Sequence, residues 1–242
     1  MHKTLEPAIL YFGTPVVLVT TLNEDGTANI APISSIWWLS WSCMIGLDAS
    51  SKTTENLLRT GECVLNMASD QQVESVNRIA KTTGRQKLPL HKKALGYQYE
   101  VNKFLTAGLT EQQSISVKPP RIEECPVQLE VKLAKTIPFG ENDSKMAVPS
   151  VAFELSIEKV HLDELILKDP NKPYVDPDKW HPLIMNFRKF YSTGSYIHES
   201  KLAQGSEAQY APWKQKGLKR KLTEWVLAKN TKRYKNAIRS TD

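Results

Sequence analysis

A run of small polar residues with one lysine, Ser50-Ser51-Lys52-Thr53-Thr54-Glu55-Asn56, has the composition of an anion-binding site. It offers four hydroxyl groups, an amide and an ammonium within seven positions. A hydroxyl cap before it and Gly61 after it predict a helix over Thr53–Arg59, and the unpaired N–H groups and dipole at a helix N-terminus favour a phosphate dianion. The same hydroxyl groups also serve as ordinary helix caps, and composition alone favours that simpler interpretation.

Other kinds of catalysis lack the residue spacings that they need. Neither Gly-x-Ser-x-Gly nor Gly-x-Gly-x-x-Gly is present, which removes the usual support for a hydrolase or a Rossmann-type enzyme. Five histidines lie far apart, without His-x-x-x-His spacing: His2, His91, His161, His181 and His198. A metal site is therefore not expected, and no residue is predicted to act as nucleophile, acid or base.

The three cysteines, Cys43, Cys63 and Cys125, suit neither a disulfide framework nor a zinc site, because they are odd in number and widely spaced. This usage predicts a reducing, cytoplasmic setting, and Cys43 and Cys63 are interpreted as small core residues. No apolar run approaches the roughly 18 residues that cross a bilayer, and the N-terminus does not resemble a signal peptide. We expect neither a membrane span nor secretion.

The elements that must position the polar run are mostly short strands. A strand, a tight turn and a strand are predicted at Thr14–Thr21, Asn23–Gly26 and Thr27–Pro32, because Gly26 tolerates the positive φ that a hairpin turn needs. Further strands are predicted at 42–47, 63–67, 114–117, 127–134 and 151–161, and a second helix at 72–81. Many short strands with few helices predict an antiparallel barrel.

The chain has 242 residues, of which 40% are apolar and 24% charged, as in soluble globular proteins of one large or two small domains. The formal net charge of +6 arises from residues 201–242, which carry +8. A basic amphipathic helix is predicted over 213–238 because apolar residues recur there at helical spacing: Leu218, Leu222, Trp225 and Val226. We expect this stripe to pack on the barrel or across a dimer rather than to bind nucleic acid.

Several segments stand in an order and spacing that are more specific than any one of them. They are Pro15–Thr21, Asp25-Gly26, Asn29-Ile30-Ala31-Pro32-Ile33-Ser34-Ser35, Ser51–Leu57, Gly61–Asn66, Lys103–Thr110, Lys118–Arg121 and Cys125–Glu130. Together they resemble the flavin reductase-like family of FMN-binding split-barrel proteins. The likeness covers roughly Tyr11 to Ala203 and leaves the basic tail uncovered.

The resemblance implies a mainly β protein with peripheral helices (β+α). The expected fold is an antiparallel FMN-binding split β-barrel with a C-terminal basic helix. It further implies a homodimer that binds FMN, or FAD as the alternative, near the subunit interface. The expected domains are residues 1–205, as the flavin reductase-like split barrel, and residues 206–242, as a basic amphipathic helical extension.

With the resemblance, phosphate binding becomes the favoured interpretation of the polar run. The loop that follows Pro32 is expected to present N–H and hydroxyl groups to the polar edge of an isoalloxazine ring, although an ordinary serine-rich turn is the simpler alternative. Lys103, inside a family-like stretch, either reaches the ligand or pairs with a carboxylate. The residues predicted to bind the cofactor are Ser34, Ser35, Ile36, Ser51, Lys52, Thr53, Thr54, Asn56 and Lys103.

Two further groups of residues have open interpretations. Trp37, Trp38 and Trp41 could cover a flavin or form a nicotinamide shelf, but core or dimer packing is the favoured interpretation. The segment from Asp70 to Tyr99 is an expected excursion over part of the protein. Its cations and aromatic residues form either a lid that selects an anionic partner such as NADPH, or a solvated basic loop, which is the more common case.

The function implied is that of an FMN-binding oxidoreductase. NADH or NADPH is expected to reduce the flavin, with electrons passed to another flavin, a partner protein such as a monooxygenase, or a small acceptor. A Gly-Asp-His stretch found in many family members is replaced here by Ile157–Glu164, so His161 is interpreted as a structural residue at a strand end. The alternative function is a non-enzymatic FMN-binding electron carrier, similar to flavoredoxin.

Overall fold

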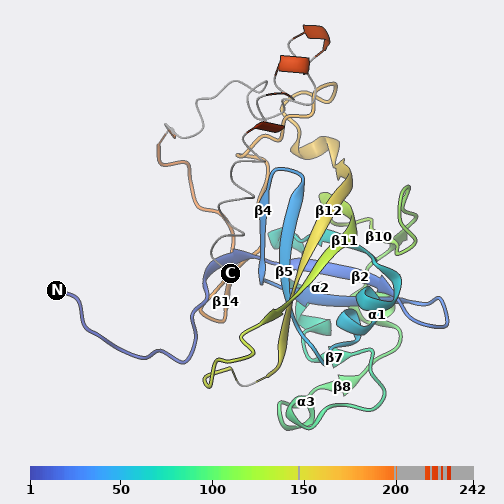
Figure 1. Ribbon diagram of the computed structural model, residues 1–242, viewed down its shortest axis with the longest axis vertical. Coiled ribbons are helices and arrows are strands. Elements are labelled where there is room, and N and C mark those ends of the chain that lie inside the picture. The colour runs from blue at the N-terminus through green and yellow to red at the C-terminus, as the bar shows by residue number, and fades with distance from the viewer. Residues whose placement is uncertain are drawn as a thin grey trace. The chain divides into compact units, whose positions relative to one another are not determined.

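The computed structural model describes residues 1–146, 148–198, 200, 216–218, 220–222, 225, 228 and 229 (Figure 1). The chain divides into two compact units, Met1–Ser195 and Tyr196–Asp242. The first unit contains all the strands and helices named below. The domain boundary expected after residue 205 lies outside the described residues.

Seven strands of the first unit form one antiparallel sheet in the order β3-β2-β6-β11-β12-β5-β4. Their bounds are β2 (Val17–Leu22), β3 (Ala28–Ile33), β4 (Ile36–Leu39), β5 (Ser42–Asp48), β6 (Glu62–Met67), β11 (Val127–Phe139) and β12 (Ser150–Leu162). Figure 1 shows β4, β5 and β12 side by side, with β11 next to β12. The antiparallel arrangement predicted from the sequence is confirmed, and β4 is a strand that the sequence analysis missed.

The remaining elements are short and surround this sheet. Smaller sheets are formed by β1 (Phe12–Pro15) with β13 (Ile184–Asn186) and β14 (Lys189–Tyr191), by β9 (Glu111–Gln112) with β10 (Arg121–Ile122), and by the parallel pair β7 (Thr82–Thr83) and β8 (Gln98–Tyr99). The helices are α1 (Lys52–Thr60), α2 (Val73–Ile79), α3 (Leu90–Ala94) and α4 (Lys103–Ala107), with 3-10 turns at η1 (Asp70–Gln72) and η2 (Glu164–Ile166). The helix expected over 72–81 is confirmed as the shorter α2, which η1 precedes directly.

Two apolar cores form because successive strand residues point to opposite faces of the sheet. Val17 and Val19 of β2 belong to the first core, with Val131 and Phe153 of the long β11–β12 hairpin. The neighbouring residue Leu18 belongs to the second core, which α2 and α4 cover with Val76, Ile79, Phe104 and Ala107. The helices thus lie against one face of β2 and β3, next to the end of the sheet where β3 is the edge strand.

The strand predicted at Ser114–Val117 is wrong. This stretch is a loop of bends, and its polar backbone groups are bonded to a side chain instead of a neighbouring strand. The carboxylate of Glu130, which is fully buried, accepts from Ile115 N at 2.8 Å, from Ser116 N at 2.5 Å and from Ser116 Oγ at 2.6 Å. His161 Nε2 lies 2.7 Å from the same carboxylate, which gives His161 the structural role expected at the end of its strand.

The basic helix expected over 213–238 lies mostly outside the described residues. Those that the structure describes between 217 and 229 are helical, and Lys229 Nζ lies 5.0 Å from the centre of the Trp225 ring, one turn away. Val226 is among the residues not described. In the part of the chain that the structure describes, we find no helix with the length and apolar character that crossing a membrane requires.

We expect Glu130→Gln to lower the free energy of unfolding by about 1.5–3 kcal/mol, the range for hydrogen bonds to a charged group. Burial alone would raise the pKa of Glu130, but the hydrogen bonds from Ser116, Ile115 and His161 outweigh it and lower the pKa to about 2 from 4.5. This carboxylate therefore stabilises the protein fully above pH 4.5 and loses its contribution as the pH falls toward 2. Urea unfolding at pH 7 and at pH 3 measures both effects.

A matched control for this prediction is Glu158→Gln, at an exposed position of the neighbouring strand β12. We expect this change to alter the free energy of unfolding by no more than about 0.5 kcal/mol. In Glu130→Gln, the difference in stability between pH 7 and pH 3 should be smaller than in the wild type. An unchanged difference would contradict the role assigned to Glu130.

Candidate functional site

A cavity of about 440 Å³ opens beside the edge strand β3. Its size falls in the range of small-molecule sites, roughly 300–1,000 Å³. Five parts of the chain form its walls: β3 with the loop Ser34-Ser35, the end of β5, the N-terminus of α1, the stretch Thr82–Gly84, and Lys103 of α4. Lys92 and Tyr97, from the excursion between α2 and α4, also line the cavity, and the rest of the lining is Tyr11, Val16, Val76, Ala80, Met185 and Phe190. The excursion therefore covers part of this cavity.

The N-terminus of α1 has the capped form that the sequence predicts. Ser51 is the N-cap, and its Oγ accepts from Thr54 N at 3.0 Å. The helix ends at Gly61, whose φ of 69° is in the left-handed region that favours glycine. Because the first N–H groups of a helix have no partner within it, those of Lys52 and Thr53 remain available at the cavity wall. The polar run can therefore serve both as a helix cap and as an anion-binding site.

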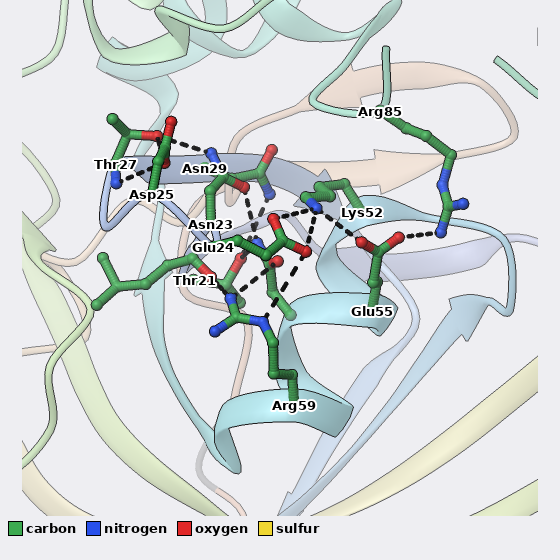
Figure 2. A network of polar contacts seen from close by, with 12 residues as sticks. Thr21, Asn23, Glu24, Asp25, Thr27, Asn29, Lys52, Glu55, Arg59 and Arg85 are labelled. Carbon is green, nitrogen blue, oxygen red and sulfur yellow. Dashed lines mark hydrogen bonds and ion pairs between the residues drawn. The ribbon is translucent and has the colours of Figure 1, made fainter. Parts of the chain in front are cut away.

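Lys52 does not face the cavity as an unpaired cation. Its Nζ is bonded to Glu24, 2.8 Å from Oε1 and 2.7 Å from Oε2, and lies 2.7 Å from Oε1 of Glu55 (Figure 2). Arg85 binds the other oxygen of Glu55, and Arg59 Nε lies 4.0 Å from Glu24. This ion-pair network therefore contains three cations and two carboxylates, which leaves a net charge of +1.

The pairing sets the ionisation of the network. Burial would lower the pKa of Lys52, but its hydrogen bonds to Glu24 and Glu55 outweigh this and raise it. The hydrogen bond from Lys52 lowers the pKa of Glu24 to about 2. Both side chains are therefore charged at neutral pH, and much of the Lys52 charge is already offset by its neighbours.

Asn29 of β3 contributes an acceptor that is not satisfied. Its side chain is buried, and its Nδ2 donates to Thr53 Oγ1 at 3.2 Å and to Thr21 Oγ1 at 3.4 Å. Its Oδ1 is buried and has no hydrogen-bond partner among the described residues. Buried polar atoms are nearly always bonded in native proteins, so an orphaned acceptor in a cavity wall indicates a ligand that donates a hydrogen bond.

Gly84 allows the backbone after β7 to approach this acceptor. A Cβ at this position would lie 2.6 Å from Asn29 Oδ1 and 3.2 Å from Lys52 Cγ. No side chain fits there unless its neighbours shift. The absence of a side chain at Gly84 therefore keeps two walls of the cavity close together.

Lys103 is buried at the cavity, with 3% of its surface exposed. Its Nζ donates to the carbonyl oxygen of Ile30 at 2.8 Å, a group that faces outward because β3 is an edge strand. The structure shows no carboxylate within ion-pair distance of it among the described residues. Burial, together with the charge of Lys92, lowers the pKa of Lys103 to about 7, while Glu100 opposes the shift.

The excursion is attached to the barrel by ion pairs at Asp48, the last residue of β5. His91 Nε2 and Lys92 Nζ of α3 lie 3.1 Å and 3.2 Å from Asp48 Oδ2. Burial would raise the pKa of Asp48, but hydrogen bonds from Ser50 and His91 and the charge of Lys92 lower it to about 2. Lys92 also lies over the Tyr97 ring, 5.9 Å from its centre. The sequence favoured a solvated basic loop over a lid, but the structure attaches this segment beside the cavity through Asp48.

The structure brings together six of the nine residues predicted to bind a cofactor. Ser34, Ser35, Ser51, Lys52, Thr53 and Lys103 line the cavity. The other three do not line it: Ile36 is buried in the first core, Thr54 Oγ1 donates to Asp48 O at 2.8 Å, and Asn56 Nδ2 donates to Thr21 Oγ1 at 3.1 Å. Thr54 and Asn56 therefore fix the start of α1 rather than face the cavity.

Sequence reasoning did not single out several lining residues: Tyr11, Asn29, Asp48, Thr83 and Gly84. Asn29 lies within one of the segments that carried the family resemblance, so that segment contained a usable signal. Asp48, by contrast, binds the excursion only because Lys92 folds back onto it. Gly84 matters only because the side chains of Asn29 and Lys52, distant in sequence, both lie next to it.

Neither the three tryptophans nor the side chains able to bind a metal form a second site among the described residues. Trp38 packs against the first core, whereas Trp37 and Trp41 are 57% and 43% exposed, and none of the three lines the cavity. Across the described part of the chain, we find no group of three or more His, Cys, Asp or Glu side chains that could hold a metal ion. Cys43 and Cys63 are buried in the first core, as expected, and burial raises the pKa of Cys43 to about 12.

Comparison with known proteins identifies the family. The model of the flavin reductase like domain matches residues 9–194. The chain belongs to the flavin reductase-like family. A curated relative, the uncharacterized protein YdfE of Bacillus subtilis (strain 168), is 41% identical over 195 residues, which cover 81% of this chain and 91% of the relative. Family membership makes the chain a flavin-related oxidoreductase, as the sequence resemblance implied.

Similarity to solved structures, one of them described as having a split barrel domain, confirms the split-barrel fold. Flavoredoxin of Desulfovibrio vulgaris (Miyazaki F) superposes with a TM-score of 0.68 at 22% identity, covering 85% of this chain and 100% of that one. Nitrilotriacetate monooxygenase component B from Bacillus cereus superposes with a TM-score of 0.62 at 18% identity, covering 78% of this chain and 88% of that one. At these identities the two structures support the fold alone.

We expect Gly84→Ala to lower the free energy of unfolding by about 1–3 kcal/mol, the usual cost of overpacking. The added Cβ would clash with Asn29 Oδ1 and press on Lys52. Chemical denaturation measures the effect.

The matched control is Gly194→Ala, because a Cβ at Gly194 would meet nothing within 4 Å. It should leave stability unchanged within about 0.5 kcal/mol. Equal stability of the two variants would show that the approach of Gly84 to Asn29 does not constrain the site.

Proposed function

We propose that this protein binds FMN in the cavity beside β3 and acts as an NAD(P)H-dependent flavin reductase. The observation that carries the proposal is the set of partly satisfied polar groups in one cavity wall. These are the N-terminus of α1, the orphaned Oδ1 of Asn29 and the Lys103 amino group with its single acceptor. Such groups fit a polar, anionic, planar ligand better than an apolar one.

The phosphate of FMN would bind at the N-terminus of α1. The free N–H groups of Lys52 and Thr53 and the hydroxyl of Thr53 supply donors there, whereas the Ser51 hydroxyl already donates to Thr54 Oγ1. Lys52 contributes through the net positive charge of its network rather than as an isolated cation. FMN has one phosphate, and the N-terminus of α1 suits it better than the pyrophosphate of FAD.

Asn29 and the loop after β3 would bind the rest of the nucleotide. The orphaned Asn29 Oδ1 accepts from an N–H or hydroxyl group of the ligand. Ser35 Oγ lies 3.2 Å from the hydroxyl oxygen of Tyr11, so each of these groups keeps hydrogen-bonding capacity for a ligand. A donor from this loop beside the ring would stabilise the negative charge that accompanies reduction.

The bound flavin would supply the redox chemistry, accepting electrons from NADH or NADPH and passing them to another flavin, a partner protein or a small acceptor. The protein's part is to bind, orient and tune the cofactor, and we assign no side chain as acid or base. Lys92 and Tyr97 on the attached excursion would contact the nicotinamide nucleotide. The fold shared with nitrilotriacetate monooxygenase component B makes a monooxygenase one candidate partner.

The expected homodimer would use the free edge of the large sheet. Strand β4 lies at this edge, and Trp37, Leu39 and Trp41 at and beyond it are 57%, 74% and 43% exposed. Tryptophans are enriched in protein interfaces, so this apolar edge is a suitable contact surface for a second copy. We further propose that residues 1–205 carry the flavin chemistry and that residues 206–242 are an extension to it.

The first experiment is an absorption spectrum of the purified protein after incubation with FMN and desalting. The protein should retain flavin, and anaerobic NADH or NADPH should bleach it. Retained flavin that bleaches only with dithionite would identify an electron carrier, the alternative function, instead of a reductase. Loss of the flavin, with no FMN binding by fluorescence titration, would exclude the cavity as a flavin site.

Lys52→Ala should weaken FMN binding by about 1.5–3 kcal/mol, roughly 10- to 150-fold. The variant loses a cation at the phosphate end and leaves Glu24 and Glu55 less fully neutralised. Quenching of FMN fluorescence measures the dissociation constant.

Lys132→Ala, at an exposed position of β11, is the matched control for the loss of one positive charge. Its FMN affinity should equal that of the wild type. An unchanged affinity in Lys52→Ala would remove the ion-pair network from the phosphate site.

A further inference from the structure

Lys103 is the one cavity residue described here whose charge is both buried and poorly compensated. An ammonium has three N–H donors, and the structure shows a single acceptor, the carbonyl oxygen of Ile30. The side chain of Lys52, which is 12% exposed, is bonded to two carboxylates instead. A buried cation with so little compensation favours its neutral form until an anion arrives.

The charges around Lys103 do not favour its ammonium in the free protein. The positive charge of Lys92 in α3 disfavours the ammonium form of Lys103, and the negative charge of Glu100, just before α4, favours it weakly. In the cavity wall, Lys52 is paired with Glu24 and Glu55, and Asp48 with Lys92 and His91. On the neighbouring elements, Arg78 of α2 donates to Ala107 O, and Glu74 of α2 and Lys189 of β14 are exposed to solvent. The adjoining strand β3 carries no charged residue.

We propose that Lys103 takes up a proton from solvent when an anionic flavin nucleotide binds, changing from a neutral amine to an ammonium that contacts the ligand. This proposal rests on the flavin-binding function proposed above and adds a proton to its binding equilibrium. In the free protein the amine donates a hydrogen bond to Ile30 O, and the structure shows no other acceptor for it among the described residues. In the complex the negative charge of the nucleotide supplies the counter-charge that the wall lacks.

The expected pH dependence follows from linkage. The pKa of Lys103 is lowered to about 7 in the free protein, chiefly by burial. If the ligand raises it above about 9, the FMN dissociation constant should increase roughly 25- to 50-fold between pH 7 and pH 9. At pH 8 the binding of one FMN should take up close to one proton. The phosphate of FMN, with a second pKa of about 6, is already a dianion over this range.

Isothermal titration calorimetry of wild-type protein with FMN tests the proposal directly. Titrations at pH 8 in buffers of different ionisation enthalpy give the number of protons taken up. A value near one is expected, and a value near zero, with FMN bound, would overturn the proposal while leaving flavin binding intact.

Two variants assign the proton to its residue. Lys103→Met and Lys103→Gln should bind FMN with the same affinity at pH 7 and pH 9 and take up no proton. Lys132→Met is the matched control and should keep the wild-type pH dependence. His91→Gln removes an imidazole that lies 3.1 Å from Asp48 beside the cavity, and it should also keep that dependence. Proton uptake that persists in the Lys103 variants would overturn the assignment.

A measurement on the free protein separates this proposal from the proposed function. Lysines methylated with ¹³C-formaldehyde can be titrated by NMR, with the Lys103 signal assigned by its absence from Lys103→Gln. A midpoint near pH 7 supports the proposal even if FMN fails to bind and another anion must be the ligand. A midpoint near the ordinary value of lysine, about 10.4, would overturn it.

Discussion

The ion pairs of Lys52 are the constraint on which the rest of the site depends. The ammonium joins the β2–β3 turn to α1, and Arg85 extends the network to the stretch after β7 (Figure 2). These parts of the chain are distant in sequence, and both α1 and the stretch after β7 supply walls of the cavity. A side chain that is 12% exposed keeps its charge only if opposite charges compensate the loss of water. The two carboxylates therefore position the N-terminus of α1 as well as Lys52.

The buried polar groups of this protein differ in how completely their hydrogen bonds are formed. Glu130, outside the cavity, is bonded by backbone and side-chain donors and keeps a loop in place. Asn29 and Lys103, at the cavity, each keep unused hydrogen-bonding capacity. A saturated buried network stabilises one structure, whereas an unsaturated one gains free energy when a ligand completes it. This difference distinguishes the scaffold from the site within a single small barrel.

Much of the fold was predictable because its signals are local. The alternation Val127, Leu129, Val131 predicted β11, and the caps at Ser51 and Gly61 predicted α1. The failure at 114–117 has a different cause. That stretch contains strand-forming residues, but its N–H groups are bonded to a buried carboxylate 14 or 15 residues away, which no local pattern reveals. Strand β4 was missed because its tryptophans suggested a packing cluster and its edge position was unknown.

The family, the barrel class and the polar run at the start of α1 can be identified from residue order alone, because they depend on residue types at fixed spacing along the chain. Which polar groups face the cavity depends on how the chain folds. The tertiary structure paired Lys52 with Glu24 and Glu55, turned Asn56 inward toward Thr21, and left Lys103 with one acceptor. Whether a polar side chain binds a ligand or stabilises the fold depends on its partners. Those partners come from distant segments that only folding brings into contact.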